Sequence, residues 1–318
     1  MVAIVLSHPE IAEIVAIARV SPVASSGGNS TIKRVSHRGK NYAVKDYSGR
    51  VNGRERLAQE FSALTLVHPA LPKNFPEPLG IAAGGLQAVH SWINGVRPHL
   101  DVFTVDRMLS LAADLHLLSS HVARNGALPA TDQVLTVGDI LDQIRTRAGG
   151  LVTDSPGVAE FTRMHLLPVL EHLPQPDGEA SPAILTLSVS DFGAHNLLWD
   201  EEDQVMRCVD LEFFGWDDAH KLTIDALLHP LAHWTTACAE AFLDGAFDLY
   251  HLDERRLLSL WPYLSLKWGT ITLARAARTI NARSDATAEA MRLSHTYVSH
   301  ARQPPRALSD IVAQAVGS

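Results

Sequence analysis

Hydrophobic and polar positions divide the chain into a strand-rich first part and a helix-rich second part. After a short helix and then a strand within the first 20 residues, alternating patterns between Gly- or Pro-containing turns predict strands over 31–35, 41–46, 79–83 and 86–93. Apolar residues spaced three or four positions apart predict helices over 54–67, 105–121, 135–147, 158–173, 219–229, 231–250 and 254–283. This order of elements indicates an α+β protein.

Two short apolar runs in the second half carry polar residues at their ends. The run Ile184–Val189 leads into Asp191, and Asn196 stands five positions later. A further strand, Val205–Val209, ends on Asp210. Because a tight hairpin with an acidic turn joins these pieces, we expect the side chains of Asp191, Asn196 and Asp210 to share one small volume.

Two carboxylates and an amide in one place are the groups that phosphoryl transfer from a nucleotide requires. Asp191 also begins the triplet Asp-Phe-Gly, which protein kinases use to hold metal. In that role it would need a catalytic Asp followed by Asn upstream, and residues 165–182 offer Asp177 without a following Asn. We therefore interpret Asp191 as the catalytic residue and Asp210 as a metal ligand.

A lysine in the third strand is a candidate phosphate contact. Lys45 ends the segment Tyr-Ala-Val-Lys, which is close to the Val-Ala-Ile-Lys signature of kinases. Strand alternation points Lys45 to the face opposite Val44. Glu60 lies beside the apolar stripe of the following helix and can reach back to Lys45, with Glu55 as the fallback partner.

Two backbone segments are further candidates for nucleotide contacts. A flexible turn can bring amides close to phosphate oxygens; it consists of Gly27, Gly28, Asn29 and Ser30. The end of the last strand can offer backbone groups to an adenine edge; it consists of Ser91, Trp92 and Ile93. Each segment alone also fits an ordinary turn or edge strand, and the chain has neither a Walker A pattern nor GxGxxG.

Composition narrows the class of protein. The 318 residues carry a formal net charge of −8, which argues against a nucleic-acid partner because such surfaces are normally basic. Cys208 and Cys238 form no CxxC pair and indicate buried thiols in a reducing compartment. The apolar N-terminus lacks a basic start and is interrupted by polar residues, so we expect no membrane span and a cytoplasmic location.

Together these residues resemble the aminoglycoside phosphotransferase and choline kinase family over roughly residues 20–285. The most specific portion is Ser190–Asn196 followed by Asp210-Leu211-Glu212. The family motif has His two places before the catalytic Asp, and here that place holds Val189. The resemblance implies a protein-kinase-like bilobal fold, with a nucleotide-binding lobe over 1–95 and a mostly helical lobe with the catalytic loop over 96–318.

The resemblance also implies roles for individual residues and the identity of the cofactors. Asp191 would be the catalytic base, Lys45 would contact the phosphates of ATP, and Mg²⁺ would be bound by Asn196 and Asp210. Glu212 would join the metal shell or touch the substrate.

The acceptor is expected to be a small hydroxylated molecule. A protein kinase follows its metal Asp with a long activation segment, whereas here only six residues separate Glu212 from the predicted helix at Ala219. Two alternatives stay open. Val189 favours a non-catalytic nucleotide-binding module of the same fold, and the acidic turns alone would also fit solvated loops of an unrelated α+β enzyme.

Overall fold

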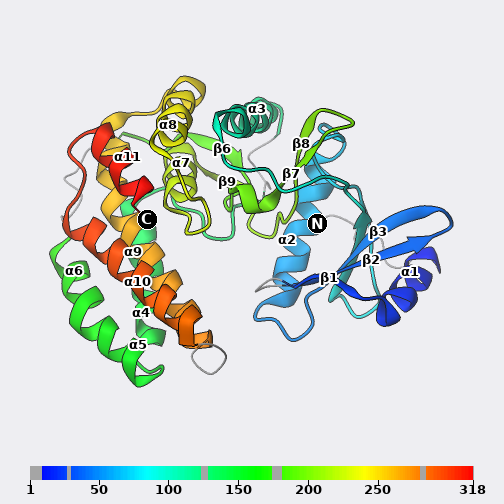
Figure 1. Ribbon diagram of the computed structural model, residues 1–318, viewed down its shortest axis with the longest axis horizontal. Coiled ribbons are helices and arrows are strands. Elements are labelled where there is room, and N and C mark those ends of the chain that lie inside the picture. The colour runs from blue at the N-terminus through cyan, green and yellow to red at the C-terminus, as the bar shows by residue number, and fades with distance from the viewer. Residues whose placement is uncertain (1–8, 27–29, 123–127, 174–180, 280–283, 318) are drawn as a thin grey trace. The chain divides into compact units, whose positions relative to one another are not determined.

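The computed structural model describes residues 9–26, 30–122, 128–173, 181–279 and 284–317 (Figure 1). They form two compact units, each assembled from several stretches of chain. The first, here called the sheet unit, comprises Met1–His99, Ser110–Thr131 and Val189–Trp216. The second, here called the helical unit, comprises Leu100–Leu109, Asp132–Ser188 and Asp217–Ser318. The predicted α+β class, with a small antiparallel sheet and a larger helical part, is confirmed, whereas the functional boundary after residue 95 stays a prediction.

The described residues of the sheet unit include a five-stranded sheet, a hairpin and the helices α1 and α2. The sheet has the order β1-β2-β3-β5-β4 and consists of β1 (Val23–Ser26), β2 (Thr31–His37), β3 (Lys40–Asp46), β4 (Pro78–Ile81) and β5 (Gln87–Ser91). The hairpin pairs β7 (Leu197–Asp200) with β8 (Val205–Cys208). The helices are α1 (Pro9–Val20) and α2 (Gly53–Val67), and a 3-10 turn, Ala194–Asn196, precedes β7.

Side-chain alternation gives the sheet two different faces. Val44 of β3 and Val89 of β5 pack with α1 in one hydrophobic cluster. Ala88 of β5 packs with Phe61 of α2 in a second cluster. Because successive residues of a strand point to opposite faces, Lys45, which pairs with Ala88, lies on the α2 face, as the sequence predicts. The register of β3 thus directs a lysine toward the helix that follows it.

The helical unit is organised around its longest helix, α9 (Glu254–Thr279), which packs against four others, α4, α5, α7 and α10; α9 and α10 run side by side in Figure 1. The remaining elements are α4 (Val137–Leu151), α5 (Pro156–Phe161), a π turn (Thr162–Leu166), α6 (Leu167–His172), β6 (Leu185–Ser188), α7 (Ala219–Leu228), α8 (Thr236–Tyr250), α10 (Ser284–Arg302) and α11 (Leu308–Val316). Two elements have residues in both units: α3 (Val102–Ser119) and β9 (Gly215–Asp218).

Two predicted helices differ from the structure at prolines. The helix predicted over 158–173 is interrupted by the π turn, and α6 then has Pro168 in its first turn, where the missing N–H is tolerated. The helix predicted from residue 231 begins only at Thr236. Pro230 precedes it, and the Thr235 hydroxyl accepts a hydrogen bond from the Cys238 N–H as an N-cap.

Gly215 of β9 packs closely against the chain segment that precedes residue 131. A Cβ atom at this position would overlap the backbone of Pro129 and Ala130. The Ala130 N–H also donates a hydrogen bond to the Trp216 carbonyl oxygen. We expect Gly215→Ala to destabilise the protein by about 1–3 kcal/mol, because backbone cannot move aside as a flexible side chain can. Gly149→Ala in α4 is the control, since its Cβ would meet no atom within 4 Å. Equal urea-denaturation midpoints for the two variants would contradict the prediction.

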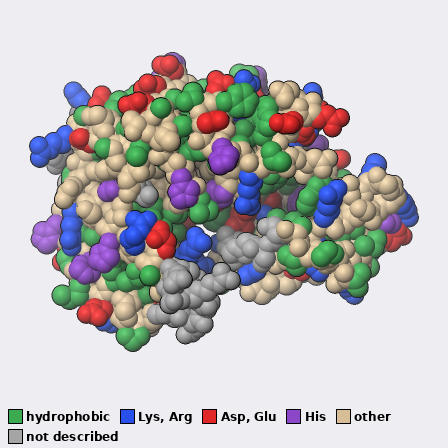
Figure 2. All heavy atoms as spheres, viewed as in Figure 1, with side chains coloured by type: hydrophobic (Ala, Val, Ile, Leu, Met, Phe, Trp, Pro, Cys, Tyr) green, Lys and Arg blue, Asp and Glu red, His purple; other side chains and the backbone are tan. Residues whose placement is uncertain are grey.

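The described residues also bear on three expectations from the sequence: no membrane span, buried thiols and no basic surface for nucleic acid. In this part of the chain, no helix combines the length and apolar character that crossing a bilayer requires. Cys208 and Cys238 are both buried and unbridged, as expected. Figure 2 shows Lys and Arg side chains of the described residues dispersed over the visible face rather than gathered in one patch. The absence of a nucleic-acid partner stays a prediction.

Candidate active site

The β7–β8 hairpin brings two of the predicted oxygen ligands together. Leu197 pairs with Cys208, and the Val209 N–H donates to the Asn196 carbonyl oxygen at 2.9 Å. Asp210 therefore follows directly after the residue that is bonded to Asn196. Asp210 itself has a left-handed backbone with φ of 68°, which turns the chain out of the strand. Antiparallel register is thus the physical reason that residues 14 positions apart adjoin.

A tight turn after β6 presents Asp191 next to the same hairpin. Ser190 has φ of 62°, and the Asp191 N–H donates to the Val189 carbonyl at 2.8 Å. The Asn196 Nδ2 amide donates to the Asp191 carbonyl at 3.0 Å, which leaves Asn196 Oδ1 as the oxygen with which this side chain can hold a cation. Non-glycine residues with positive φ cost free energy, and such residues cluster at functional sites.

Lys45 lies between two carboxylates. Its Nζ is 3.0 Å from Glu60 Oε1, 2.8 Å from Glu60 Oε2 and 2.6 Å from Asp210 Oδ1. Lys45 and Glu60 are both 4% exposed, whereas the Asp210 side chain is 36% exposed. Glu60, and not the exposed fallback candidate Glu55, is therefore the helix α2 partner of Lys45.

Negative charge exceeds positive charge at this lysine. Burial opposes the charge of Lys45, but the carboxylates of Asp210 and Glu60 outweigh it and raise the lysine pKa above its ordinary value. Burial raises the pKa of Asp210, and the negative charges of Glu60 and Asp191 add to this effect while Lys45 opposes it. Two carboxylates at one ammonium, with the Asp191 carboxylate near Asp210, suit a site that receives a further cation, and their oxygen donors are those that Mg²⁺ prefers.

Two residues that the sequence did not single out surround Glu60. The Tyr47 hydroxyl donates to Glu60 Oε2, and the buried Tyr47 side chain lies in the cluster under α2. His90 is 3% exposed, and burial lowers its pKa to about 4, so its ring is neutral at physiological pH. Strand alternation could have indicated both residues, since Tyr47 follows the end of β3 two positions after Lys45 and His90 lies in β5 two positions after Ala88.

Glu212 pairs with an arginine of the same helix that carries Glu60. The Arg56 Nη1 atom is 2.8 Å from Glu212 Oε1, and Glu212 is 1% exposed. The Arg56 guanidinium also lies 5.0 Å from the centre of the Phe213 ring. Arg56 and Glu60 are four residues apart and thus share one face of α2. The place of Glu212 in a metal shell stays a prediction, and its contact with Arg56 is a role that sequence patterns did not indicate.

We expect the Arg56–Glu212 pair to contribute to folding stability. Arg56→Met would lower the free energy of unfolding by about 2–3 kcal/mol, below the cost for a fully buried pair because Arg56 is part-exposed. Arg54→Met, at an exposed position of α2, is the control. In a double-mutant cycle by urea denaturation, Glu212→Gln and Arg56→Met should couple by about 1–2 kcal/mol. Additive effects of the two substitutions would show that the contact is energetically unimportant.

The other predicted nucleotide contacts are described only in part. Gly27, Gly28 and Asn29 lie outside the described residues, and Ser30 is 5% exposed. At the end of β5, the Ser91 N–H donates to Glu77 O at 2.9 Å and the Trp92 N–H donates to Asn41 O at 3.1 Å. These amides are already bonded within the protein.

An adenine contact from this segment would therefore use carbonyl oxygens or the backbone of Ile93, and it stays a prediction.

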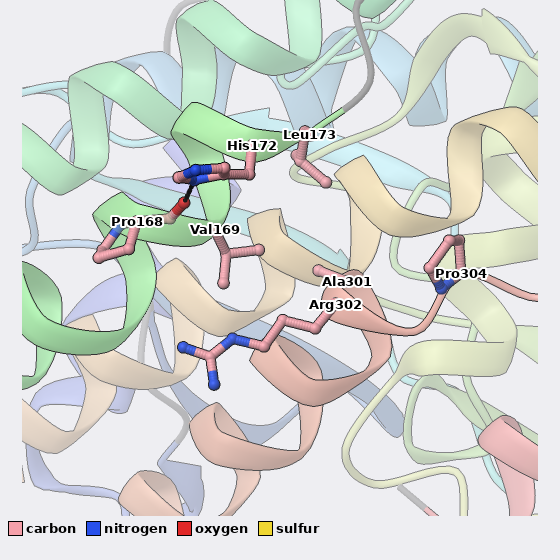
Figure 3. A pocket seen from close by; sticks show the side chains of 7 residues that line it. All are labelled: Pro168, Val169, His172, Leu173, Ala301, Arg302 and Pro304. Carbon is pink, nitrogen blue, oxygen red and sulfur yellow. Dashed lines mark hydrogen bonds between the residues drawn. The ribbon is translucent and has the colours of Figure 1, made fainter.

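The helical unit contains a separate pocket of about 440 Å³. It is lined by Pro168, Val169, His172, Leu173, Ala301, Arg302 and Pro304. In Figure 3 the His172 ring is hydrogen-bonded to the Pro168 carbonyl, and the Arg302 side chain lies across the pocket from it. Among the described residues, none of the predicted catalytic, metal or nucleotide residues lines this pocket.

Comparisons with protein-family models and with curated proteins found no match. Solved structures match over most of the chain. Ethanolamine kinase from Plasmodium vivax has 9% identity and a TM-score of 0.60, covering 88% of this chain and 81% of that one. Choline kinase from Streptococcus pneumoniae has 13% identity and a TM-score of 0.59, covering 92% and 99%.

An aminoglycoside phosphotransferase in complex with ADP and hygromycin B is also similar. It has 17% identity and a TM-score of 0.53, and the match covers 91% of this chain and 96% of that one. At these identities the likeness concerns the fold. The chain has the protein-kinase-like fold of small-molecule kinases such as the aminoglycoside phosphotransferases and choline kinases.

Proposed function

We propose that this protein is a Mg²⁺-dependent phosphotransferase that moves a phosphoryl group from ATP to the hydroxyl of a small molecule. The observation that carries the proposal is the bridging position of Lys45 between Glu60 and Asp210, with Asn196 joined to the residue before Asp210. Lys45 would anchor the nucleotide phosphates, and Glu60 would hold Lys45 in place.

The chain's oxygen donors fit a bound magnesium ion. Asn196 Oδ1 and the part-exposed Asp210 carboxylate would hold it, and the surplus of negative charge around Lys45 supports this assignment. Bound Mg²⁺ supplies neutralisation of the charge on the phosphates. The Asp191 carboxylate, 28% exposed, would accept the proton of the acceptor hydroxyl and orient its oxygen. Residues 1–95 would then form the nucleotide-binding lobe, and residues 96–318 would supply the groups that recognise the acceptor.

Thermal shift measurements followed by a transfer assay test the proposal. ATP with Mg²⁺ should raise the melting temperature, because a ligand that binds the native state stabilises it. ADP release should then depend on one member of a panel of amino sugars, amino alcohols and other hydroxylated metabolites. If neither nucleotide with Mg²⁺ nor any acceptor had an effect, the proposal would be wrong.

One observation favours a second function. Val189, at the place of the family's motif histidine, is apolar and 1% exposed, which suits a nucleotide-binding module without transfer activity. Such a module would show the thermal shift with nucleotide and no ADP release with any acceptor.

A further inference from the structure

A side chain that contacts the Asp191 carboxylate comes from the turn that follows it. His195 Nε2 lies 3.3 Å from Asp191 Oδ1 and 3.4 Å from Oδ2, so it is almost equally distant from both oxygens. The two side chains are 19% and 28% exposed, which places the contact at the edge of the unit's interior. On the strand side of Asp191, Val189 is buried and its side chain has no hydrogen-bonding group.

The geometry points to His195 as a positioning residue for Asp191, an inference that rests on the proposed function. A carboxylate rotates about its last side-chain bond with broad, weakly separated minima. A donor placed symmetrically before both oxygens narrows this rotation and fixes which oxygen faces the acceptor hydroxyl. Orientation of a catalytic group contributes strongly to the rate when little covalent chemistry is required of the protein.

The turn itself is held by other hydrogen bonds. The Asn196 N–H donates to Gly193 O at 2.9 Å, and Asn196 Nδ2 donates to Asp191 O at 3.0 Å. Removing the His195 imidazole therefore leaves the backbone bonds of the turn in place. Its loss should appear in the turnover rate rather than in folding or nucleotide affinity.

Three substitutions test whether a hydrogen-bond donor at the position of His195 Nε2 is what matters. The Gln side chain can place its amide nitrogen at that position. The Asn side chain is one carbon shorter, so its amide nitrogen cannot reach it. We expect His195→Ala and His195→Asn to lower kcat by about 10- to 100-fold, with KM for ATP within about twofold of wild type. His195→Gln should restore kcat to within about fivefold. His68→Gln is the control, since His68 is half-buried in the same unit and its ring bonds to the Phe75 carbonyl.

A double-mutant cycle tests whether His195 acts through Asp191. In the background of Asp191→Asn, His195→Ala should change the residual rate less than about twofold, because the group that it positions is gone. Equal kcat for wild type and His195→Ala, or independent effects in the cycle, would overturn the inference while leaving the proposed function intact.

A structural measurement tests the same inference without any acceptor. In crystal structures, the Asp191 carboxylate should change its side-chain rotamer in His195→Ala and keep it in His195→Gln. An unchanged Asp191 in His195→Ala would overturn the positioning role. Failure of the proposed function looks different, because wild-type protein would then neither bind ATP with Mg²⁺ nor transfer phosphate.

Discussion

Asp191→Asn should lower kcat by about 100- to 10,000-fold, the range that a positioned general base contributes. Asn has nearly the same shape as Asp, and its side-chain oxygen can accept the His195 hydrogen bond. It cannot accept a proton from the acceptor hydroxyl. The Kd for ATP should change less than about threefold, because Lys45, Asn196 and Asp210 are retained. Kinetics of ADP release and isothermal titration calorimetry with ATP and Mg²⁺ measure the two effects.

Asp154→Asn is the matched control for this experiment, since Asp154 is exposed in the loop before α5. When no acceptor has been identified, slow hydrolysis of ATP provides the rate, because water then replaces the acceptor. Turnover of Asp191→Asn equal to that of wild type would exclude Asp191 as the base. Loss of ATP binding together with turnover would instead indicate that Asp191 belongs to the nucleotide site.

Lys45→Met should weaken nucleotide binding and destabilise the fold. Met preserves most of the length of the side chain but lacks the ammonium that would bond to phosphate, so ATP affinity should fall by about 10- to 100-fold. Glu60 would lose the cation that lies within 3.0 Å and would be left in a buried position. Breaking a buried pair by removing one partner costs about 3–5 kcal/mol. Urea denaturation and calorimetry measure these two losses.

The variant Lys45→Met, Glu60→Gln separates the two effects. Removing both charges should recover most of the stability but none of the ATP affinity, because the neutral amide can still accept the Tyr47 hydrogen bond. Recovery of ATP binding in this variant would show that Lys45 has no direct contact with the nucleotide.

The stability of the single variant Lys45→Met should depend on pH. In the wild type, burial opposes the Glu60 charge, but Lys45 and the neighbouring donors lower the Glu60 pKa below its ordinary value. Without Lys45, burial dominates and the pKa of Glu60 in the folded state lies above that in the unfolded state. The folded variant then binds more protons than the unfolded chain, so its stability decreases as pH rises through that raised pKa. Urea denaturation at pH 5 and pH 8 should show the larger deficit at pH 8.

Local sequence patterns were sufficient to predict the helices and strands and the relative placement of several site residues. Strand alternation determines that Lys45 and Val44 face opposite sides of the sheet, whatever else packs there. Hairpin register likewise determines that Asn196 and Asp210 approach each other, because only a short turn connects β7 and β8. Both inferences concern residues that lie within about 15 positions of each other in the chain, so sequence spacing alone is enough to make them.

Contacts between distant stretches required the tertiary structure. Arg56 and Glu212 are 156 positions apart, and nothing in either local pattern indicates that α2 lies beside the segment after β8. The apolar stripe of α2 already favoured Glu60 over Glu55, and the packing that buries one face of α2 and exposes the other agrees with that preference. Strand and helix periods follow from backbone geometry within one segment, whereas these pairs arise from how segments bury their apolar faces together. The sequence by itself therefore determined the elements and the candidate residues, and the packing of α2 decided which charges meet.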